Sequence, residues 1–489
     1  MKRLLIANRG EIAVRISRTA RERGLETVAV YSTADRTAPH ALACDFAVEI
    51  GPPAASDSYL SFEAILGAAR RMNADAIHPG YGFLSENAAF AAAVQSAGLT
   101  WVGPEPASMR IMGDKIAARE AMTRAGVPVV PGHQSPGASD AELEEASAKV
   151  GFPLLVKASA GGGGKGMRRV ESRAELSPAL EGARREAAAA FGRGDVYLER
   201  EIEAPRHVEF QIFGDRAGKI FALAERECSI QRRHQKIVEE APCASLDPKV
   251  RKRMADAATA AGRSVSYLGA GTVEFLVDRH ENFYFLEMNT RLQVEHPVTE
   301  WTLGVDLVAA QLSVAEGQPL PSDWKDLSPR GHAIECRVSA EDPDTYLPRT
   351  GTVLAYEEPA GPGIRVDSGI AQGSVVGIDY DPLLAKVIVH AETRTGAIAR
   401  MRRALRSFVL LGVETNLPLL SRVLESEDFA AGRTDTAFLS RLNPAPPRED
   451  PPIAAQIAAD RAAESRSAVD RSASSRSDPW RSGGGWRLG

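Results

Sequence analysis

The sequence GTVEFLVDRHENFYFLEMN spans residues 271–289. Two apolar segments rich in β-branched and aromatic residues are joined by the polar turn RHEN at residues 279–282, a pattern typical of a β-hairpin. If the strands pair symmetrically about this turn, Asp278 faces Phe283. Glu274 then faces Glu287 directly across the ladder. The hairpin therefore predicts two carboxylates side by side between apolar strands.

The predicted carboxylate pair requires a cation, because like charges directly opposite one another destabilise a sheet. Asn289 lies two residues beyond Glu287, on the same face of the strand, and adds a third oxygen ligand. Two carboxylates and an amide suit Mg²⁺ or Mn²⁺, with substrate phosphates completing the coordination. We therefore predict a metal–nucleotide site at Glu274, Glu287 and Asn289. A register slipped by one residue would instead place the carboxylates on opposite faces.

The next segment, RLQVEHP, carries a cation, an amide and a carboxylate at alternate positions, namely Arg291, Gln293 and Glu295. The residue before Pro297 favours extended geometry, which would project these three side chains from one side of the chain. The planar guanidinium of Arg291 suits a small planar oxyanion, and Glu295 suits a general base. Taken alone, the pattern would indicate a surface row of ion pairs. Its position beside the predicted metal site favours a catalytic role.

A glycine-rich segment, KASAGGGGKGM, occupies residues 157–167. Five glycines in six positions after a predicted strand provide backbone N–H groups that can turn toward an anion, and Lys157 and Lys165 add positive charge. The segment lacks the Gly-Lys-Ser/Thr ending of a P-loop, and a β segment rather than a helix is predicted after it. It favours a mobile flap over phosphates, with a flexible hairpin tip as the alternative.

The remaining segments predict how the chain is organised. Short apolar runs alternate with amphipathic stretches before residue 113, which predicts a parallel sheet covered by helices. The first turn, NRGE at residues 8–11, lacks the G-x-G-x-x-G spacing of nicotinamide and flavin enzymes, so that class is disfavoured. Alternation in HVEFQI at residues 207–212 predicts a half-buried antiparallel strand in an α+β middle region. Prolines between Pro444 and Pro452 predict a boundary.

Length and composition limit the class of function. The chain of 489 residues is 44% hydrophobic and 25% charged, which predicts a folded protein of about three domains. Its net charge of -5 provides no basic field for nucleic acid or for an anionic membrane surface. The 4 cysteines include no C-x-x-C pair, and the sequence has no signal peptide or apolar run long enough to span a membrane. We therefore expect a cytoplasmic protein.

Several long segments together match one family. They are IANRGEIA (6–13), HPGYGFLSEN (78–87), the glycine-rich segment, RECSIQRRHQK (226–236) and the run from Phe285 to Glu300. From residue 1 to about 445 the sequence resembles the biotin carboxylase domain of biotin-dependent acyl-CoA carboxylase α subunits, which belong to the ATP-grasp superfamily. The family includes α subunits of the methylcrotonyl-, geranyl- and propionyl-CoA carboxylase type. The tail segments DPW (478–480) and GWRLG (485–489) resemble the start of the next domain in longer α subunits, particularly of the methylcrotonyl- or geranyl-CoA type.

The resemblance implies a multidomain protein of the α/β and α+β classes. We expect a Rossmann-like N-terminal domain at residues 1–112 and an ATP-grasp domain at residues 113–330, with a mobile glycine-rich lid at about 130–205. A mixed α/β C-terminal domain is expected at residues 331–445. Residues 446–489 are expected to form a linker or the start of a following domain.

The resemblance also implies a reaction and its residues. Such enzymes use MgATP and bicarbonate to form carboxyphosphate, and then carboxylate a ureido nitrogen of biotin. The residues matched to nucleotide binding are Lys115, Lys157, Gly162, Gly163, Gly164, Lys165, Gly166, Glu199, Ile202, His207, Gln231, His234, Glu274 and Glu287. The residues matched to bicarbonate are Lys236, Arg291, Gln293, Val294 and Glu295, and those matched to biotin are Tyr81 and Arg337. The implied catalytic residues are Lys236, Arg291, Glu295 as the base, and Arg337 as the group that stabilises the biotin enolate.

The expected cofactors are ATP, Mg²⁺ or Mn²⁺, and biotin. The sequence Ala-Met-Lys-Met, which is biotinylated in carrier domains of this family, does not occur, so biotin is expected on a separate carrier domain. A carboxyltransferase β subunit is expected as a further partner in an oligomeric assembly. Two alternatives remain: another ATP-grasp carbon–nitrogen ligase, such as a carbamoyl phosphate synthase-like enzyme, and a non-catalytic scaffold. Intact Lys236, Arg291 and Glu295 argue against the scaffold.

Overall fold

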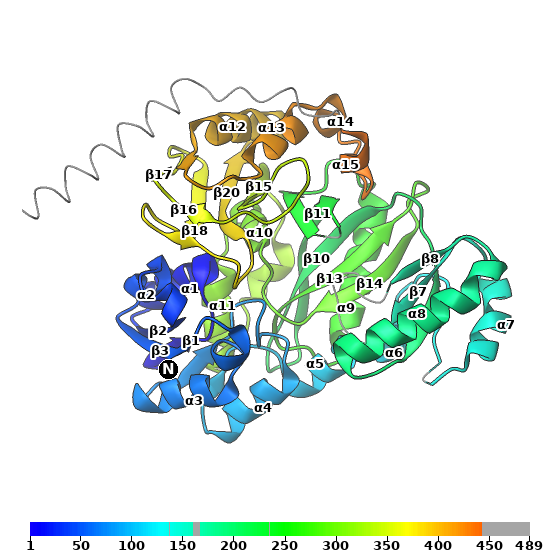
Figure 1. Cartoon of the computed structure of the whole chain (residues 1–489), viewed down its shortest axis with the longest axis horizontal. Coiled ribbons are helices and arrows are strands. Elements are labelled where there is room, and N and C mark those ends of the chain that lie inside the picture. Colours follow the sequence, from blue (N-terminus) through cyan, green and yellow to red (C-terminus); the bar gives the residue numbers. More distant parts are fainter. Residues whose placement is uncertain (136, 160–166, 234, 443–489) are drawn as a thin grey trace, which may run out of the picture.

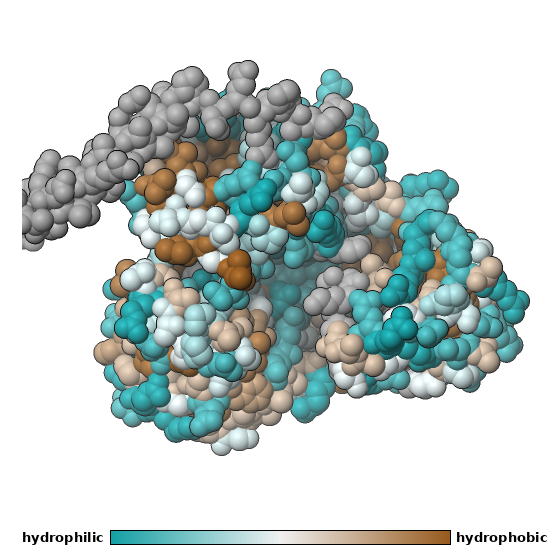
Figure 2. All heavy atoms as spheres, in the orientation of Figure 1, coloured by the Kyte–Doolittle hydropathy of each residue, from teal (hydrophilic) through white to brown (hydrophobic). Residues whose placement is uncertain are grey.

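The computed structural model describes residues 1–442 except 136, 160–166 and 234. The chain forms an N-terminal lobe, a small lid lobe, and a large lobe that contains the middle and C-terminal regions (Figure 1). Figure 2 shows a hollow where the three lobes meet. Residues 160–166 of the glycine-rich segment, His234 and residues 443–489 lie outside the described residues.

The N-terminal lobe is built on a parallel sheet in the order β3-β2-β1-β4-β5, which is the Rossmann-like order. Leu4 and Leu5 of β1 point to opposite faces, and both are fully buried because helices cover both faces. The predicted βα pattern is thereby confirmed. The elements are β1 (Arg3–Ile6), α1 (Gly10–Glu22), β2 (Glu26–Ser32), α2 (Pro39–Ala43), β3 (Phe46–Gly51), α3 (Phe62–Arg71), β4 (Ala76–His78), α4 (Ala88–Ser96), β5 (Thr100–Trp101) and α5 (Pro106–Gly113).

The lid lobe, on the right of Figure 1, has its own antiparallel sheet in the order β6-β9-β7-β8 and its own apolar core. Its helix α7 begins at Asp140, where Ser139 and Glu142 form a capping box. The elements are β6 (Gly132–His133), α7 (Asp140–Val150), β7 (Leu154–Ala158), β8 (Arg168–Val170), α8 (Arg173–Phe191) and β9 (Val196–Arg200). Helix α6 (Lys115–Arg124) connects this lobe to the N-terminal lobe.

The large lobe is organised by an antiparallel sheet in the order β14-β13-β10-β11-β12-β15-β20-β18. This sheet crosses the expected boundary at residue 331, because β12 pairs with β15 and Glu239 lies opposite Glu335. The middle and C-terminal regions therefore share one sheet. The strands are β10 (Arg206–Gly214), β11 (Ile220–Arg232), β12 (Gln235–Ala241), β13 (Gly269–Val277), β14 (Phe283–Asn289), β15 (His332–Ser339), β18 (Ile364–Ser368) and β20 (Leu383–Ala391).

Helices and two small strand pairs complete the large lobe. Strands β16 and β19 pair with one another, as do β17 and β21. In Figure 1, α12 and α13 lie at the top of the lobe, while α10 lies near the centre of the molecule. The elements are α9 (Pro248–Ser264), α10 (His296–Leu303), α11 (Leu307–Ala315), β16 (Gly351–Thr352), β17 (Ala355–Glu357), β19 (Val375–Val376), α12 (Arg394–Ser407), β21 (Val409–Leu411), α13 (Leu417–Glu425), α14 (Glu427–Ala430) and α15 (Phe438–Arg441).

The prediction of a half-buried strand at residues 207–212 is wrong in one respect. Strand β10 is antiparallel, but every one of these residues is buried. Val208 and Phe210 point into an apolar core, whereas His207 and Glu209 lie on the face that carries the site described below. The alternation therefore separates two buried environments, one apolar and one polar, rather than core from solvent.

Candidate active site

A cavity of about 1280 Å³ lies between the lobes. It is lined by residues of the N-terminal lobe, the lid lobe and the large sheet. The residues predicted from the sequence that line it are Tyr81, Lys115, Lys157, Glu199, Ile202, His207, Gln231, Lys236, Glu274, Glu287, Asn289, Arg291, Gln293, Val294, Glu295 and Arg337. Every predicted site residue that the structure describes is therefore brought to one cavity. Gly162, Gly163, Gly164, Lys165, Gly166 and His234 lie outside the described residues.

The hairpin of β13 and β14 places Glu274 directly opposite Glu287, as predicted. The register nearer the turn differs from the prediction, because Val277 rather than Asp278 pairs with Phe283. Asp278 belongs to the turn, where its carboxylate accepts hydrogen bonds from backbone N–H groups. A bulge in β14 then takes up one residue and restores the opposed carboxylates.

Lys236 on β12 is the point at which the polar side chains of the site meet. Its Nζ donates hydrogen bonds to carboxylates on three different segments: Glu209 at 2.5 Å, Glu274 at 2.8 Å and Glu295 at 2.7 Å. Burial alone would lower the pKa of Lys236, but the three carboxylates hold it well above its usual value. Lys236 therefore stays charged and holds Glu274 of the β13–β14 hairpin close to Glu295, the predicted base.

Arg226 on β11 is a buried residue whose role sequence reasoning missed. Its side chain is fully buried and donates to Glu209 (2.5 Å), Gln211 (2.8 Å), Thr272 (2.9 Å), Thr299 (2.9 Å) and Gln293 (3.1 Å). A buried guanidinium needs such complete pairing, because an unpaired one would be costly. Arg226 thus joins β10 and β13 to the segment that carries Gln293. The alternation of polar residues at 207–212 was the sequence signal that could have revealed this buried group of polar side chains around Arg226.

Glu295 lies between two cations. Its carboxylate accepts from Lys236 on one oxygen and from Arg337 Nη2 on the other, the latter at 2.8 Å. Arg337 also pairs with Glu239 at 2.5 Å, a partner that sequence reasoning missed. Burial alone would raise the pKa of Glu295, but Lys236 and Arg337 hold it well below its usual range. Glu295 is therefore ionised at neutral pH and able to accept a proton.

The backbone around Glu295 is not extended as predicted. Glu295 is the N-cap of α10, with φ −81° and ψ 9°, and His296 is already helical with Pro297 in the first turn. Proline is favoured there because the first turn requires no backbone N–H donor from it. Gln293 and Glu295 still reach one cluster, since the Gln293 amide donates to Glu274 at 2.8 Å. A turn, rather than a strand, brings these side chains together.

Arg291 is positioned at the edge of the same cluster. Its Nε donates to Glu86 at 2.9 Å, and its Nη2 donates to the side-chain Oδ1 of Asn289 at 3.0 Å. Thr290 N–H also donates to Glu86, which comes from the N-terminal lobe. The guanidinium is thus held between two lobes, and Glu86 is a further residue that sequence reasoning missed.

The other side of the cavity carries the residues matched to nucleotide binding. Lys157 of β7 and Arg119 of α6 both pair with the carboxylate of Glu199. The Glu199 carboxylate is therefore engaged by two cations. Burial lowers the pKa of Lys115, although Glu287 opposes this effect.

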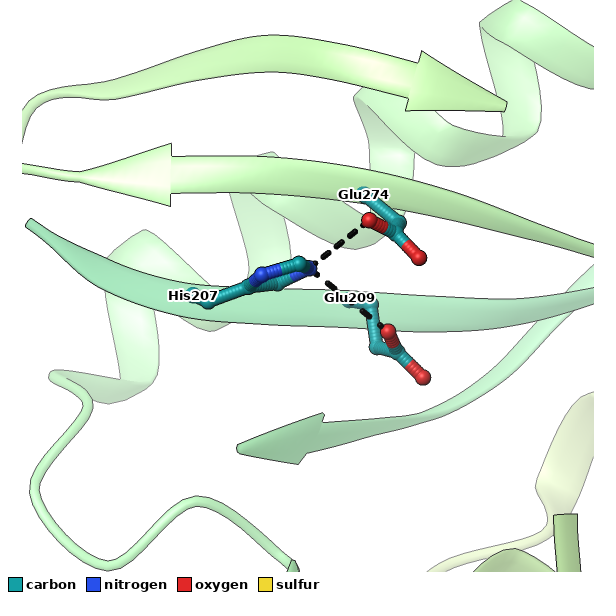
Figure 3. Close-up of side chains that lie close together, drawn as sticks. All are labelled: His207, Glu209 and Glu274. Atoms are coloured by element: carbon teal, nitrogen blue, oxygen red, sulfur yellow. Dashed lines mark ion pairs between the residues drawn. The ribbon is translucent and has the colours of Figure 1, made fainter. Parts of the chain in front are cut away.

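His207 lies between two carboxylates, as Figure 3 shows. Its Nε2 is 2.9 Å from Glu274 Oε2 and 3.8 Å from Glu209 Oε2. Two buried groups hold ligand-type atoms within 4.8 Å of one another: His207, Glu209 and Glu274, and Glu209, Cys228 and Glu295. Both contain Glu209, whose charge is already balanced by Lys236 and Arg226. Neither group therefore needs a further cation.

The residues predicted as metal ligands fit a hard divalent cation. Glu274 and Glu287 are opposed across the hairpin, and Asn289 lies close enough to donate its amide to Glu274 Oε1 at 2.7 Å. Burial and the neighbouring Glu274 both raise the pKa of Glu287, although Lys115 opposes them. A cation at this pair would relieve that repulsion. The donor set consists of oxygen atoms, which suits Mg²⁺ or Mn²⁺.

A large antiparallel sheet faces a small separate lid lobe, with lysines and opposed carboxylates in the cavity between them. This arrangement defines the class of ATP-grasp ligases. Three family models match the chain: biotin carboxylase N-terminal domain at residues 1–109, carbamoyl-phosphate synthase L chain ATP-binding domain at 114–323, and biotin carboxylase C-terminal domain at 335–441. The chain belongs to the biotin carboxylase family.

Curated relatives and solved structures agree with this assignment. The chain is 48% identical over 442 residues to a biotin carboxylase of Nostoc sp., covering 90% of this chain and 99% of the relative. It is also 48% identical over 442 residues to the mitochondrial methylcrotonoyl-CoA carboxylase subunit alpha of Arabidopsis thaliana, covering 90% of this chain and 60% of the relative.

Among solved structures, a biotin carboxylase–β-γ-ATP complex from Campylobacter jejuni has a TM-score of 0.88 and 44% identity, covering 90% of this chain and 98% of that chain. A biotin carboxylase domain dimer of the Hydrogenobacter thermophilus 2-oxoglutarate carboxylase, in complex with MgADP, ADP and bicarbonate, has a TM-score of 0.87 and 43% identity. It covers 91% of this chain and 99% of that chain.

These matches confirm the resemblance, the fold class and the expected ATP-dependent ligase class, and they favour biotin carboxylation over the carbamoyl phosphate synthase-like alternative. The cofactor expectation agrees with the MgADP and bicarbonate named for the Hydrogenobacter structure. Among the described residues, no helix is long and apolar enough to cross a membrane.

Proposed function

We propose that the chain carboxylates biotin on a carrier domain, using ATP and bicarbonate through carboxyphosphate, as the first half-reaction of an acyl-CoA carboxylase. The observation that carries the proposal is the position of Glu295. Its ionised carboxylate lies between Lys236 and Arg337 and beside the Glu274–Glu287 hairpin. These positions support a proton acceptor, two cations and a metal–nucleotide site acting together in one cavity.

In the first step, Glu295 would accept the proton of bicarbonate while the same bicarbonate oxygen bonds to the γ-phosphorus of ATP and ADP departs. The positive charges of Lys236 and Arg291 would hold bicarbonate. To do so, Lys236 would give up a hydrogen bond to one of its carboxylate partners and donate to the bicarbonate instead. The peptide of Val294, which lines the cavity between Gln293 and Glu295, offers backbone contacts to the same anion.

Positioning and charge neutralisation dominate phosphoryl transfer. Lys115 and Lys157 supply positive charge on the nucleotide side, and Glu199, Ile202, His207 and Gln231 would border the nucleotide there. Glu274, Glu287 and Asn289 would hold Mg²⁺ or Mn²⁺, whose positive charge would neutralise the phosphates of the nucleotide.

In the second step, the C–O bond between the carboxyl group and the phosphate of carboxyphosphate would break, and the departing phosphate would accept the ureido N–H proton of biotin. The carboxyl carbon would then bond to that nitrogen, while Arg337 stabilises the enolate-like oxygen of biotin. Tyr81 lines the same cavity from the N-terminal lobe and would border the biotin ring. We further propose a separate biotin carrier domain and a carboxyltransferase β subunit as partners within an oligomeric assembly. The matching methylcrotonoyl-CoA carboxylase alpha subunit and the dimeric Hydrogenobacter domain support this part of the proposal.

The direct test of this function measures ADP formation by the purified chain. We expect ATP hydrolysis that depends on bicarbonate, increases with free biotin and consumes no ammonia. Carboxybiotin formation from labelled bicarbonate would be measured in parallel. Ammonia-dependent formation of carbamoyl phosphate, or no ATP turnover with all substrates present, would contradict the proposal.

The proposed metal ligands make a second prediction. Replacing Glu287 by Gln removes one carboxylate of the pair, so the Mg²⁺ concentration that gives half-maximal activity should rise by about 10-fold or more, equivalent to the ~1.4 kcal/mol of a tenfold change. Titrating activity with Mg²⁺ and following Mn²⁺–ATP binding by electron paramagnetic resonance would measure the change. Glu63→Gln on the exposed first turn of α3 is the matched control. An unchanged metal requirement in Glu287→Gln would place the ligands elsewhere.

A further inference from the structure

Lys386 on β20 is a buried cation that the proposed reaction does not use directly. Its side chain is 0% exposed, and its Nζ donates a hydrogen bond of 2.8 Å to the backbone carbonyl of Val294. Val294 lies between Gln293, which donates to Glu274, and Glu295. Lys386 therefore holds the peptide that leads directly into the proposed base.

The ammonium group is itself held by carboxylates from two lobes. Glu11 Oε2, in the first turn of α1, lies 3.4 Å from Lys386 Nζ, and Asp367 Oδ2 on β18 lies 3.8 Å away. Asp367 is also bonded twice by Arg365, whereas the buried oxygens of Glu11 have no other hydrogen-bond partner among the described residues. Glu11 therefore has Lys386 as its nearest compensating charge.

The sheet register places Lys386 beside the catalytic machinery. Lys386 pairs directly with Arg337 across β15 and β20, so their side chains lie on the same face. Arg337 holds the Glu295 carboxylate, and Lys386 holds the peptide that precedes Glu295. Two neighbouring cations thus restrain both the side chain and the backbone of one residue.

We infer that Lys386 is a positioning residue, which acts on the proposed reaction through the Val294–Glu295 peptide and is kept in place by Glu11. Without its ammonium group, a backbone carbonyl beside the cavity loses its hydrogen-bond donor, and the peptide is free to rotate. Displacement of a reacting group by about 1 Å can cost on the order of 10² in rate. This inference rests on the function proposed above.

The test compares two variants with the wild-type chain. Lys386→Met removes the ammonium group but leaves Glu11 without its counter-charge, which destabilises the fold. The double variant Glu11→Gln with Lys386→Met removes both charges and keeps similar volumes. Lys252→Met on α9 is the matched control, since the Lys252 side chain is 78% exposed and pairs with Asp256 within its own helix.

We expect kcat for bicarbonate-dependent ATP hydrolysis to fall on the order of 10- to 10²-fold in the double variant, counted per ATP-binding site. The KM for ATP should stay within about twofold of wild type, because the hydrogen bond and ion pairs of Lys386 go to Val294, Glu11 and Asp367, none of which binds the nucleotide in the proposed function. The control should match the wild type. A purely structural role would lower the amount of folded protein and leave kcat per ATP-binding site unchanged.

A folded double variant with wild-type kcat would overturn the inference while leaving the proposed function intact. An inactive wild-type chain would instead overturn the proposed function, and the inference with it. If Lys386→Met alone does not fold, the double variant decides the question.

Discussion

Replacing Glu295 by Gln is expected to lower kcat for bicarbonate-dependent ATP hydrolysis by about 10²- to 10⁴-fold, the range of general acid–base catalysis. The substitution keeps the shape of the side chain and removes the proton acceptor. Lys236 retains Glu209 and Glu274 as partners, so the cluster should stay assembled. Steady-state ADP release with saturating ATP would measure the loss.

Two further measurements distinguish a lost base from a damaged fold. The thermal midpoint of Glu295→Gln and its affinity for an ATP analogue should remain close to those of wild type. Glu63→Gln, at an exposed position on α3, should leave every parameter unchanged. Retention of near-wild-type kcat in Glu295→Gln would exclude Glu295 as the base.

Replacing Arg337 by Ala is expected to lower biotin carboxylation on the order of 10²- to 10³-fold, by analogy with the loss of one oxyanion-hole donor. The guanidinium is fixed by Glu239 and Glu295, so it presents a preorganised positive charge to the enolate-like oxygen of biotin. Carboxybiotin formation from labelled bicarbonate would measure this loss. The Arg337→Lys variant should recover only part of the rate, because an ammonium group lacks the fork that contacts both carboxylates.

Arg403→Ala provides the control for Arg337, since Arg403 lies on an exposed face of α12 in the same lobe. It should carboxylate biotin at the wild-type rate. Near-normal carboxylation by Arg337→Ala would exclude Arg337 from the second step. The role of Glu295 in the first step is measured separately, in Glu295→Gln.

Local patterns predicted the elements of this fold well, because they depend on neighbouring residues. The βα pattern of the N-terminal lobe and the apolar halves of the hairpin are examples. The carboxylate pair at Glu274 and Glu287 was also predicted, but the predicted strand pairing near the turn was wrong. Asp278 belongs to the turn, so Val277 pairs with Phe283, and a bulge in β14 shifts the pairing back by one residue. Symmetric pairing about the turn does not predict that bulge.

Predictions failed where packing, not periodicity, decides the environment. The alternation in β10 was interpreted as one buried and one solvent-exposed face, but β11 and β13 flank the strand and β12 contributes Lys236 to its polar face. Similarly, His296 was predicted to be extended because it precedes Pro297, but α10 begins there. In both cases, tertiary contacts overrode a valid local preference.

The sequence by itself therefore determined the local elements, the oxygen-rich hairpin and the family, since each is carried by residues close together in the chain. Only the tertiary structure decided which distant charges meet. Arg226 reaches Gln293, and Lys386 reaches both Glu11 and Val294. These contacts join residues separated by tens to hundreds of positions, and burial makes each charge depend on its partner. No local pattern encodes such a pairing, because it exists only once the lobes are packed together.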